Sequence, residues 1–345
     1  MFRSIRHSHR PSLNTGNTQL SLSLHPHRFR SLTSMTNPPK LTSKHGGSGD
    51  AARNERRAIA KSTLEVIEAG HYVVEGIEHD IRPQLDAMLS GTRYYSPDSL
   101  LSHWPRPPTG DYTRKKATEI SIVEISTLEC AKLLSSTPYT SPEETRRRVG
   151  VLNFACAKYP GGGFLLGANA QEESIARSST LYSSLTCPTG EQFYDLHKKD
   201  PRGGYYTHAM IFSPDVTVFR ADTGGLVDPI QIDVVTSPAV NARVVRRTSN
   251  AGEEEEEKIG KVMKERMSRI LFLFEKHGIK DLVLGSFGTG AFQNKISVVA
   301  PVWAELLAVP GARFSNSFDR VTFAILGHQT LAEFKDAFEA RQGTK

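Results

Sequence analysis

Apolar residues in this chain follow two spacings that alternate along most of its length. Short apolar runs predict strands, and they fall at residues 119–126, 149–155, 207–214, 216–222, 230–240, 280–287 and 319–326. Apolar residues at helical spacing predict amphipathic helices at residues 171–185, 258–277, 298–307 and 331–342. Unbroken apolar strands that alternate with such helices indicate an α/β sandwich with helices on both faces of a sheet. Ligands of such folds bind where strands run into the loops that follow them.

The part before residue 119 has a different pattern. Residues 51–89 look helical, with Ile59, Leu64 and Ile67 on one face and Gly70 as a plausible stop. Residues 97–110 are proline-rich and irregular, and residues 141–148 are expected to form a short capped helix. We therefore expect a leader at residues 1–49, a helical extension at 50–118 and the main domain at 119–345.

The leader accounts for the basic charge of the chain. Residues 1–49 hold seven Lys and Arg residues and no acid, so the formal charge of +6 leaves −1 for the rest. The composition predicts a disordered segment that resembles a mitochondrial transit peptide. A plain tail, with Met35 as the true initiator, is the alternative, so nucleus, cytoplasm and mitochondrion stay open. The near-neutral body gives no reason to expect sequence-specific nucleic-acid binding.

Two further function classes find no support in the sequence. No apolar stretch reaches the ~20 residues that a membrane-spanning helix needs. The cysteines Cys130, Cys156 and Cys187 are far apart and match no metal-ligand spacing. We expect buried thiols in a reducing compartment, with a reactive thiol at Cys156 as the alternative.

The most informative segment is residues 151–185, which reads as strand, glycine loop and helix. Gly161, Gly162 and Gly163 remove three Cβ atoms in a row, so the backbone can approach a ligand with its N–H groups. The helix then opens with Gln171, Glu172 and Glu173. Acids in a first turn and glycines in a loop are each common. Their combination in this order is what points to a site.

A second glycine loop lies at residues 282–294, after a strand and before a helix. Gly285, Gly288 and Gly290 form a nest of backbone amides that suits a phosphate or diphosphate. The loop is neither a Walker A motif nor a dinucleotide fingerprint. Phe287 and Phe292 interleave with the glycines, so either ring could cover a ribose or belong to the core. A third strand–loop segment, residues 233–241, says little alone.

Together these segments resemble the GGG…QEE signature of poly(ADP-ribose) glycohydrolases, in the compact microbial-type branch. The resemblance covers about residues 55–340 and includes "TSPAVN" and "LVLGSFGTGAF". It implies a macrodomain-like three-layer α/β/α sandwich with a mixed sheet and an N-terminal helical extension. It also implies a glycosidase that removes ADP-ribose from poly(ADP-ribose), reversing ADP-ribosylation without metal or cofactor.

The resemblance also assigns roles. Glu173 matches the general acid, Glu172 the carboxylate that holds ribose hydroxyls, and Gln171 a further substrate-binding residue. The remaining substrate-binding positions are Asn153, Gly161, Gly162, Gly163, Gly288, Thr289, Gly290, Ala291 and Phe292. The chain departs from the pattern at four places: Cys156 replaces a common Asn, Thr289 a common Cys and Gln293 a common Gly, and the acidic run 253–257 is extra. We expect that run to be a solvated surface insertion without a role.

We therefore expect an enzyme, a poly(ADP-ribose) glycohydrolase that acts as a monomer on poly(ADP-ribose) or ADP-ribosylated proteins, away from membranes. A non-catalytic ADP-ribose-binding macrodomain is one alternative, although binding alone needs no paired acids. A mono-ADP-ribosyl hydrolase is the other, because the same pocket would hold the terminal unit.

Overall fold

A computed structural model describes residues 48–105, 116–136, 148–248 and 252–343. The described residues all belong to one compact unit. The predicted leader, except for residues 48 and 49, and the predicted helix at residues 141–148, except for residue 148, lie outside the described residues.

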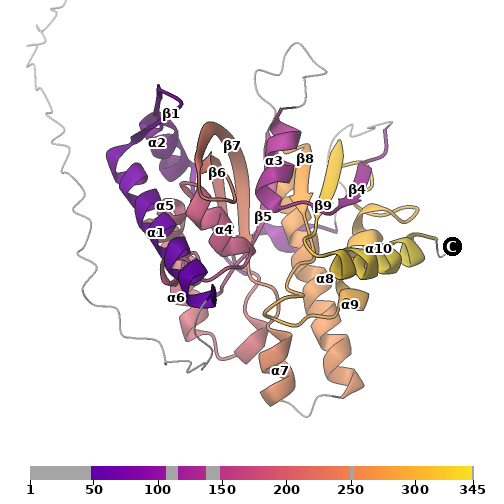
Figure 1. The fold of residues 1–345 in the computed structure, drawn as a ribbon. Coiled ribbons are helices and arrows are strands. Elements are labelled where there is room, and N and C mark those ends of the chain that lie inside the picture. Colours follow the sequence, from indigo (N-terminus) through magenta and orange to yellow (C-terminus); the bar gives the residue numbers. More distant parts are fainter. Residues whose placement is uncertain (1–47, 106–115, 137–147, 249–251, 344–345) are drawn as a thin grey trace, which may run out of the picture. The chain divides into compact units, whose positions relative to one another are not determined.

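A seven-stranded mixed sheet forms the centre of this unit, in the order β3-β6-β7-β5-β8-β9-β4 (Figure 1). Strands β7, β5, β8, β9 and β4 run parallel to one another, whereas β6 is antiparallel to both β7 and β3. The carboxyl ends of five strands therefore meet at one edge of the sheet. The strands are β3 (Arg93–Tyr95), β4 (Glu119–Val123), β5 (Val149–Phe154), β6 (Met210–Arg220), β7 (Leu226–Ser237), β8 (Asp281–Leu284) and β9 (Arg320–Ala324).

Helices cover both faces of the sheet, as the alternating pattern predicts (Figure 1). On β5, Val149 and Val151 face one apolar cluster and Leu152 faces the other. The first cluster holds residues of α2 (Arg82–Gly91), α3 (Thr127–Ser135), α4 (Gln171–Ser178), α5 (Leu181–Thr186) and α6 (Pro188–Lys199). The second holds residues of α7 (Ala242–Thr248), α8 (Glu253–Lys276), α9 (Ile296–Leu307) and α10 (His328–Gly343). The predicted α/β/α sandwich is confirmed.

The predicted N-terminal helical region contains a β-hairpin. Helix α1 spans Ser48–Ala69 and ends at Gly70, whose φ of +77° closes the helix as expected. Residues 71–80 then form β1 (His71–Val74) and β2 (Ile77–Asp80), so the expected continuous helical pattern is wrong there. Glu75 and Gly76 both have positive φ (+50° and +79°), which is the requirement of a two-residue hairpin turn. Within this N-terminal region, β3 also joins the main sheet.

Other boundaries also differ from the prediction. The expected helix 171–185 is two helices, α4 and α5, because Ser179 is extended and bridges to Val218 of β6. The strand-like runs 207–214 and 216–222 form one long strand, β6, with a bulge between Ser213 and Val216. Residues 253–257 are the first turns of α8 rather than an insertion before it. Acidic side chains in a first turn are favoured by the helix dipole, so the run extends the helix.

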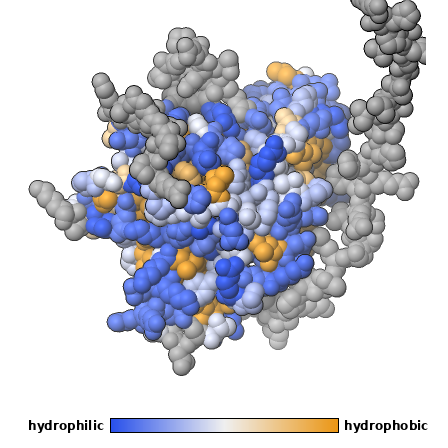
Figure 2. Space-filling view, turned by 180° about the vertical axis from the view of Figure 1, so that it is seen from behind, coloured by the Kyte–Doolittle hydropathy of each residue, from blue (hydrophilic) through white to orange (hydrophobic). Residues whose placement is uncertain are grey.

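Short 3₁₀ turns complete the described chain: η1 (Leu100–His103), η2 (Phe164–Leu166) and η3 (Gly203–Tyr205). Phe287 is fully buried and packs against Phe154, which settles its open assignment in favour of the core. On the face shown in Figure 2, hydrophobic residues form small separate spots among hydrophilic ones. None of the described helices is long and apolar enough to cross a membrane.

Candidate active site

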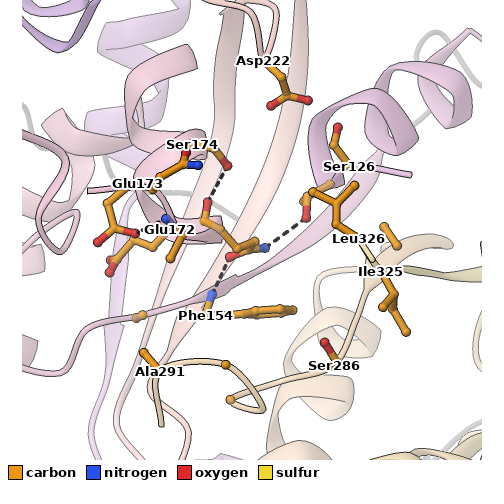
Figure 3. Close-up of a pocket in the computed structure, with 18 of the residues that line it drawn as sticks. Ser126, Phe154, Glu172, Glu173, Ser174, Asp222, Ser286, Ala291, Ile325 and Leu326 are labelled. Atoms are coloured by element: carbon orange, nitrogen blue, oxygen red, sulfur yellow. Dashed lines mark hydrogen bonds between the residues drawn. The ribbon is translucent and has the colours of Figure 1, made fainter. Parts of the chain in front are cut away.

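A cavity of about 720 Å³ opens at the carboxyl edge of the sheet. Glu172 and Glu173 project into one end from α4, and Ile325 and Leu326, which follow β9, lie at the other (Figure 3). The second glycine loop contributes Gly288, Gly290, Ala291 and Phe292 to its wall. The cavity thus joins an acidic end, a wall of loop backbone and an apolar end.

Glu172 is almost completely buried beside the end of β5. Its Oε2 accepts a hydrogen bond from the N–H of Cys156 at 2.7 Å, and its Oε1 lies 3.4 Å from Nδ2 of Asn153. Burial raises the pKa of the Glu172 carboxyl from 4.5 to about 8; the Cys156 N–H opposes this rise and the charge of Glu173 adds to it. Glu172 therefore retains its proton near neutral pH.

Glu173 is fixed by two backbone N–H groups, one on each side of the glycine-to-helix connection. Its Oε1 accepts from Gly163 at 2.9 Å and its Oε2 from Ala170 at 3.1 Å. Ala170 is the N-cap residue of α4, so a glutamate three positions later closes the reverse half of a capping box. The sequence order of glycines, linker and glutamate pair thereby places one carboxyl group at a defined point.

The three glycines lie against the carboxyl groups and outside the lining of the cavity. Gly161 and Gly162 have φ of +64° and +58°. A Cβ at Gly162 would collide with Oε1 of Glu173 and come within 3.0 Å of Oε2 of Glu172. The loop thus needs glycine both for its backbone conformation and for the closeness of the carboxyl groups.

Arginines hold the connection between the glycines and α4. The carbonyl of Leu166 accepts from Nε of Arg53 and Arg57, and that of Gly167 from Nε of Arg56, all three on α1. The next carbonyl, of Ala168, accepts from Nη1 of Arg177 on α4. Three successive carbonyls are therefore bonded to guanidinium groups, which leaves this linker little freedom.

The second loop turns sharply between β8 and α9. Gly288 has φ of +76°, and a Cβ there would collide with Ala239. Gly290 is exposed and has nothing within 4 Å of its Cβ position. Nδ2 of Asn294 donates to the carbonyls of Val240 and Gly288, which ties the loop to the segment after β7. The Phe292 ring packs on Tyr206, with centroids 6.1 Å apart.

Comparison with known proteins identifies this arrangement. Residues 60–221 match the model of the microbial-type PARG catalytic domain. The poly(ADP-ribose) glycohydrolase of Thermomonospora curvata superposes with a TM-score of 0.73 at 36% identity, over 84% of this chain and 99% of that one. The chain belongs to the microbial-type poly(ADP-ribose) glycohydrolase family. The same T. curvata enzyme bound to the inhibitor ADP-HPD gives a TM-score of 0.70.

A second glycohydrolase of the family, from Deinococcus radiodurans in complex with ADP-ribose, has 31% identity and a TM-score of 0.64. That match covers 75% of this chain and 98% of the other. No curated protein sequence matches the chain. The membership confirms the family, the fold and the glycohydrolase class that the sequence motifs implied.

In this glycohydrolase the structure brings most of the predicted site residues together. Those that line the cavity are Gln171, Glu172, Glu173, Gly288, Gly290, Ala291 and Phe292. Asn153, Gly161, Gly162, Gly163 and Thr289 lie outside that lining. Gln171 clamps the end of β5: its Oε1 accepts from Phe154 N–H, and its Nε2 donates to Leu152 O. Thr289 Oγ1 donates to Ser286 O, so its side chain stabilises the turn.

Sequence reasoning missed three residues that line the cavity. Arg177 is buried four residues after Glu173 on the same helix, a spacing that could have revealed it. Asp222, which follows β6, also lines the cavity (Figure 3). Leu326 is 68% exposed at the apolar end, and nothing in its sequence context marks it.

Proposed function

We propose that this chain removes ADP-ribose units from poly(ADP-ribose) with Glu173 as general acid and then general base. The observation that carries the proposal is the adjacent pair Glu172 and Glu173, fixed by backbone N–H groups at one end of a nucleotide-sized cavity. Binding alone would not require two carboxyl groups at this point.

The cavity can hold ADP-ribose in one orientation. Apolar side chains at the far end, Ile125, Ile325 and Leu326, suit the adenine ring. The exposed backbone of Gly288, Gly290 and Ala291 suits the diphosphate, because glycine-rich turns present N–H groups to anions. The ribose at the scissile bond then lies between Phe292 and the two glutamates. Glu172, which is protonated near neutral pH, would bind the hydroxyls of that ribose.

The reaction breaks an O-glycosidic bond between two riboses. In its protonated form, Glu173 gives its proton to the leaving ribose oxygen as the C–O bond breaks, and an oxocarbenium-like centre develops on the ADP-ribose side. The substrate diphosphate stabilises this positive charge. A water then attacks the same carbon and gives a proton to the Glu173 carboxylate, which restores the acid.

The test uses two substrates and one substitution. Purified chain is incubated with an automodified polymerase and, separately, with a mono-ADP-ribosylated protein, and released ADP-ribose is measured. We expect release from the polymer and at least a 10²-fold lower turnover in Glu173→Gln, because general acid catalysis contributes ~10²–10⁴-fold. ADP-ribose binding, followed by calorimetry, should persist.

Two controls make the result interpretable. The amide that Glu173→Gln introduces can accept only one of the two backbone N–H bonds, so a loss of about 1–2 kcal/mol in stability is expected. Thermal melting separates this from lost catalysis. Glu65→Gln, at an exposed carboxylate of α1 outside the cavity lining, should leave turnover unchanged. Parental turnover in Glu173→Gln would refute the acid assignment, and release from the mono-modified protein alone would favour the mono-ADP-ribosyl hydrolase.

A further inference from the structure

An ion pair between α7 and α8 holds the Phe292 loop from outside the cavity. Nε and Nη2 of Arg246 donate to the two carboxylate oxygens of Glu256, at 2.6 and 3.1 Å. Nη1 of Arg246 donates to the carbonyl oxygen of Gln293 at 2.6 Å. Nζ of Lys295 lies 2.9 Å from the same glutamate. Glu256 belongs to the acidic run for which the sequence suggested no role.

The carbonyl that Arg246 binds belongs to a residue in an unfavourable backbone conformation. Gln293 has φ of +56°, in the left-handed region that favours glycine. It directly follows Phe292, whose side chain lines the cavity. Non-glycine residues stay in this region only where their surroundings hold them. The Arg246 guanidinium supplies such a hold, because its own position is fixed by both oxygens of Glu256.

We propose that Arg246 and Glu256 are positioning residues of the substrate site, which keep Phe292 against the scissile-end ribose by holding the Gln293 carbonyl. The proposal rests on the proposed function, because it assumes that ADP-ribose occupies this cavity. Arg246 and Glu256 themselves lie outside the cavity lining, and they act through Phe292.

The pair is suited to this role under ordinary conditions. The hydrogen bonds from Arg246 are the main cause that lowers the pKa of the Glu256 carboxyl to about 2, so this carboxylate stays ionised near neutral pH. Their side chains are 25% and 24% exposed, outside the apolar core, so their replacement should leave the fold intact.

The experiment compares Arg246→Ala and Glu256→Gln with the unaltered chain. Calorimetry with ADP-ribose gives Kd, and hydrolysis of poly(ADP-ribose) gives KM and kcat. We expect Kd and KM to rise roughly tenfold, which corresponds to about 1.4 kcal/mol. We expect kcat to stay within about twofold, because Glu172 and Glu173 are untouched.

A second substitution tests why Arg246→Ala loses affinity. Glycine adopts positive φ without strain, so Gln293→Gly in the Arg246→Ala background should recover most of the lost affinity. A merely structural role of Arg246 would not be rescued in this way. The matched control is Glu305→Gln. Glu305 has a similar exposure, 26%, and also forms ion pairs with two cations, Lys264 and Arg341. It lies on α9, outside the cavity lining. It should leave Kd and KM unchanged.

Parental Kd and KM in both Arg246→Ala and Glu256→Gln would overturn this proposal alone. A fall in kcat at unchanged KM, or no recovery with Gln293→Gly, would also overturn it. Absence of ADP-ribose binding by the unaltered chain would overturn the proposed function and this proposal together.

Discussion

Three glycine-to-alanine substitutions test the two glycine loops separately. They differ in the backbone φ of the glycine and in the atoms that an added Cβ would contact. At Gly162 the new methyl group meets Glu173 in a backbone with φ of +58°. At Gly290 it meets nothing within 4 Å, and the backbone has no positive φ. At Gly278, after α8 and away from the cavity, φ is +68° but the space is open. Gly278→Ala therefore measures the backbone cost alone.

The structure gives the expected losses of stability and turnover. An alanine in the left-handed region costs about 1–2 kcal/mol, which should be the whole effect at Gly278. Gly162→Ala adds the displacement of Glu173 and the loss of its hydrogen bond from Gly163, about 1 kcal/mol more. A misplacement of about 1 Å can lower turnover ~10²-fold, so kcat should fall at least that far. Gly290→Ala should leave stability unchanged.

Binding supplies the decisive readout for the second loop. If the diphosphate lies against Gly290, an added methyl group crowds it, and overpacking of about 1–3 kcal/mol weakens ADP-ribose binding roughly 5- to 150-fold. The assays are calorimetric titration with ADP-ribose, melting with and without it, and polymer hydrolysis. Parental affinity in Gly290→Ala would show that the diphosphate lies elsewhere. Full turnover in Gly162→Ala would show that the loop does not position Glu173.

The remaining predictions concern pH and the N-terminus. Because Glu172 keeps its proton up to about pH 8 when folded but loses it near 4.5 when unfolded, the free energy of unfolding should fall as pH rises from about 4.5 to about 8. Denaturant unfolding should show the chain losing about 2 kcal/mol between pH 6 and 8 relative to Glu172→Gln; an equal pH dependence in both would contradict the raised pKa. Deletion of residues 1–47 should leave turnover and melting temperature unchanged, whereas deletion through Arg57 should lower both. A fluorescent protein fused to the leader should enter mitochondria if the leader is a transit peptide, and a diffuse signal would exclude that targeting.

The sequence predicted the layers of this fold well because burial on both faces of a parallel strand leaves a direct trace. Every residue of β8 is buried, and its run "DLVL" was assigned correctly. The hairpin at residues 71–80 was missed because its strands are half exposed and only the Glu75-Gly76 turn distinguishes them from helix. Local patterns thus predict elements better than the turns between them.

The candidate site also has a part that a local motif reveals and a part that only the folded chain brings together. The order of glycines and glutamates is a local motif, so the chain alone indicates that Glu172 and Glu173 belong to the candidate site, and both line the cavity. The hold of Arg246 on Gln293 joins residues 47 positions apart, and no periodicity encodes it. The positive φ of Gln293 gives a physical reason why glycine would suit that position.

The N-terminal helix α1 takes part in the site although the cavity is lined by other elements. The linker before α4 has three carbonyls that accept from arginines, and three of the four arginines are on α1. A Cβ at Gly167 would collide with the carbonyl oxygen of Arg53, so helix and linker meet backbone to backbone. The linker ends at Ala170, whose N–H bonds Glu173. The contacts of α1 therefore hold the linker, and the linker holds the Glu173 carboxyl through the N–H of Ala170. A sheet with a glycine loop would not by itself position this carboxyl group.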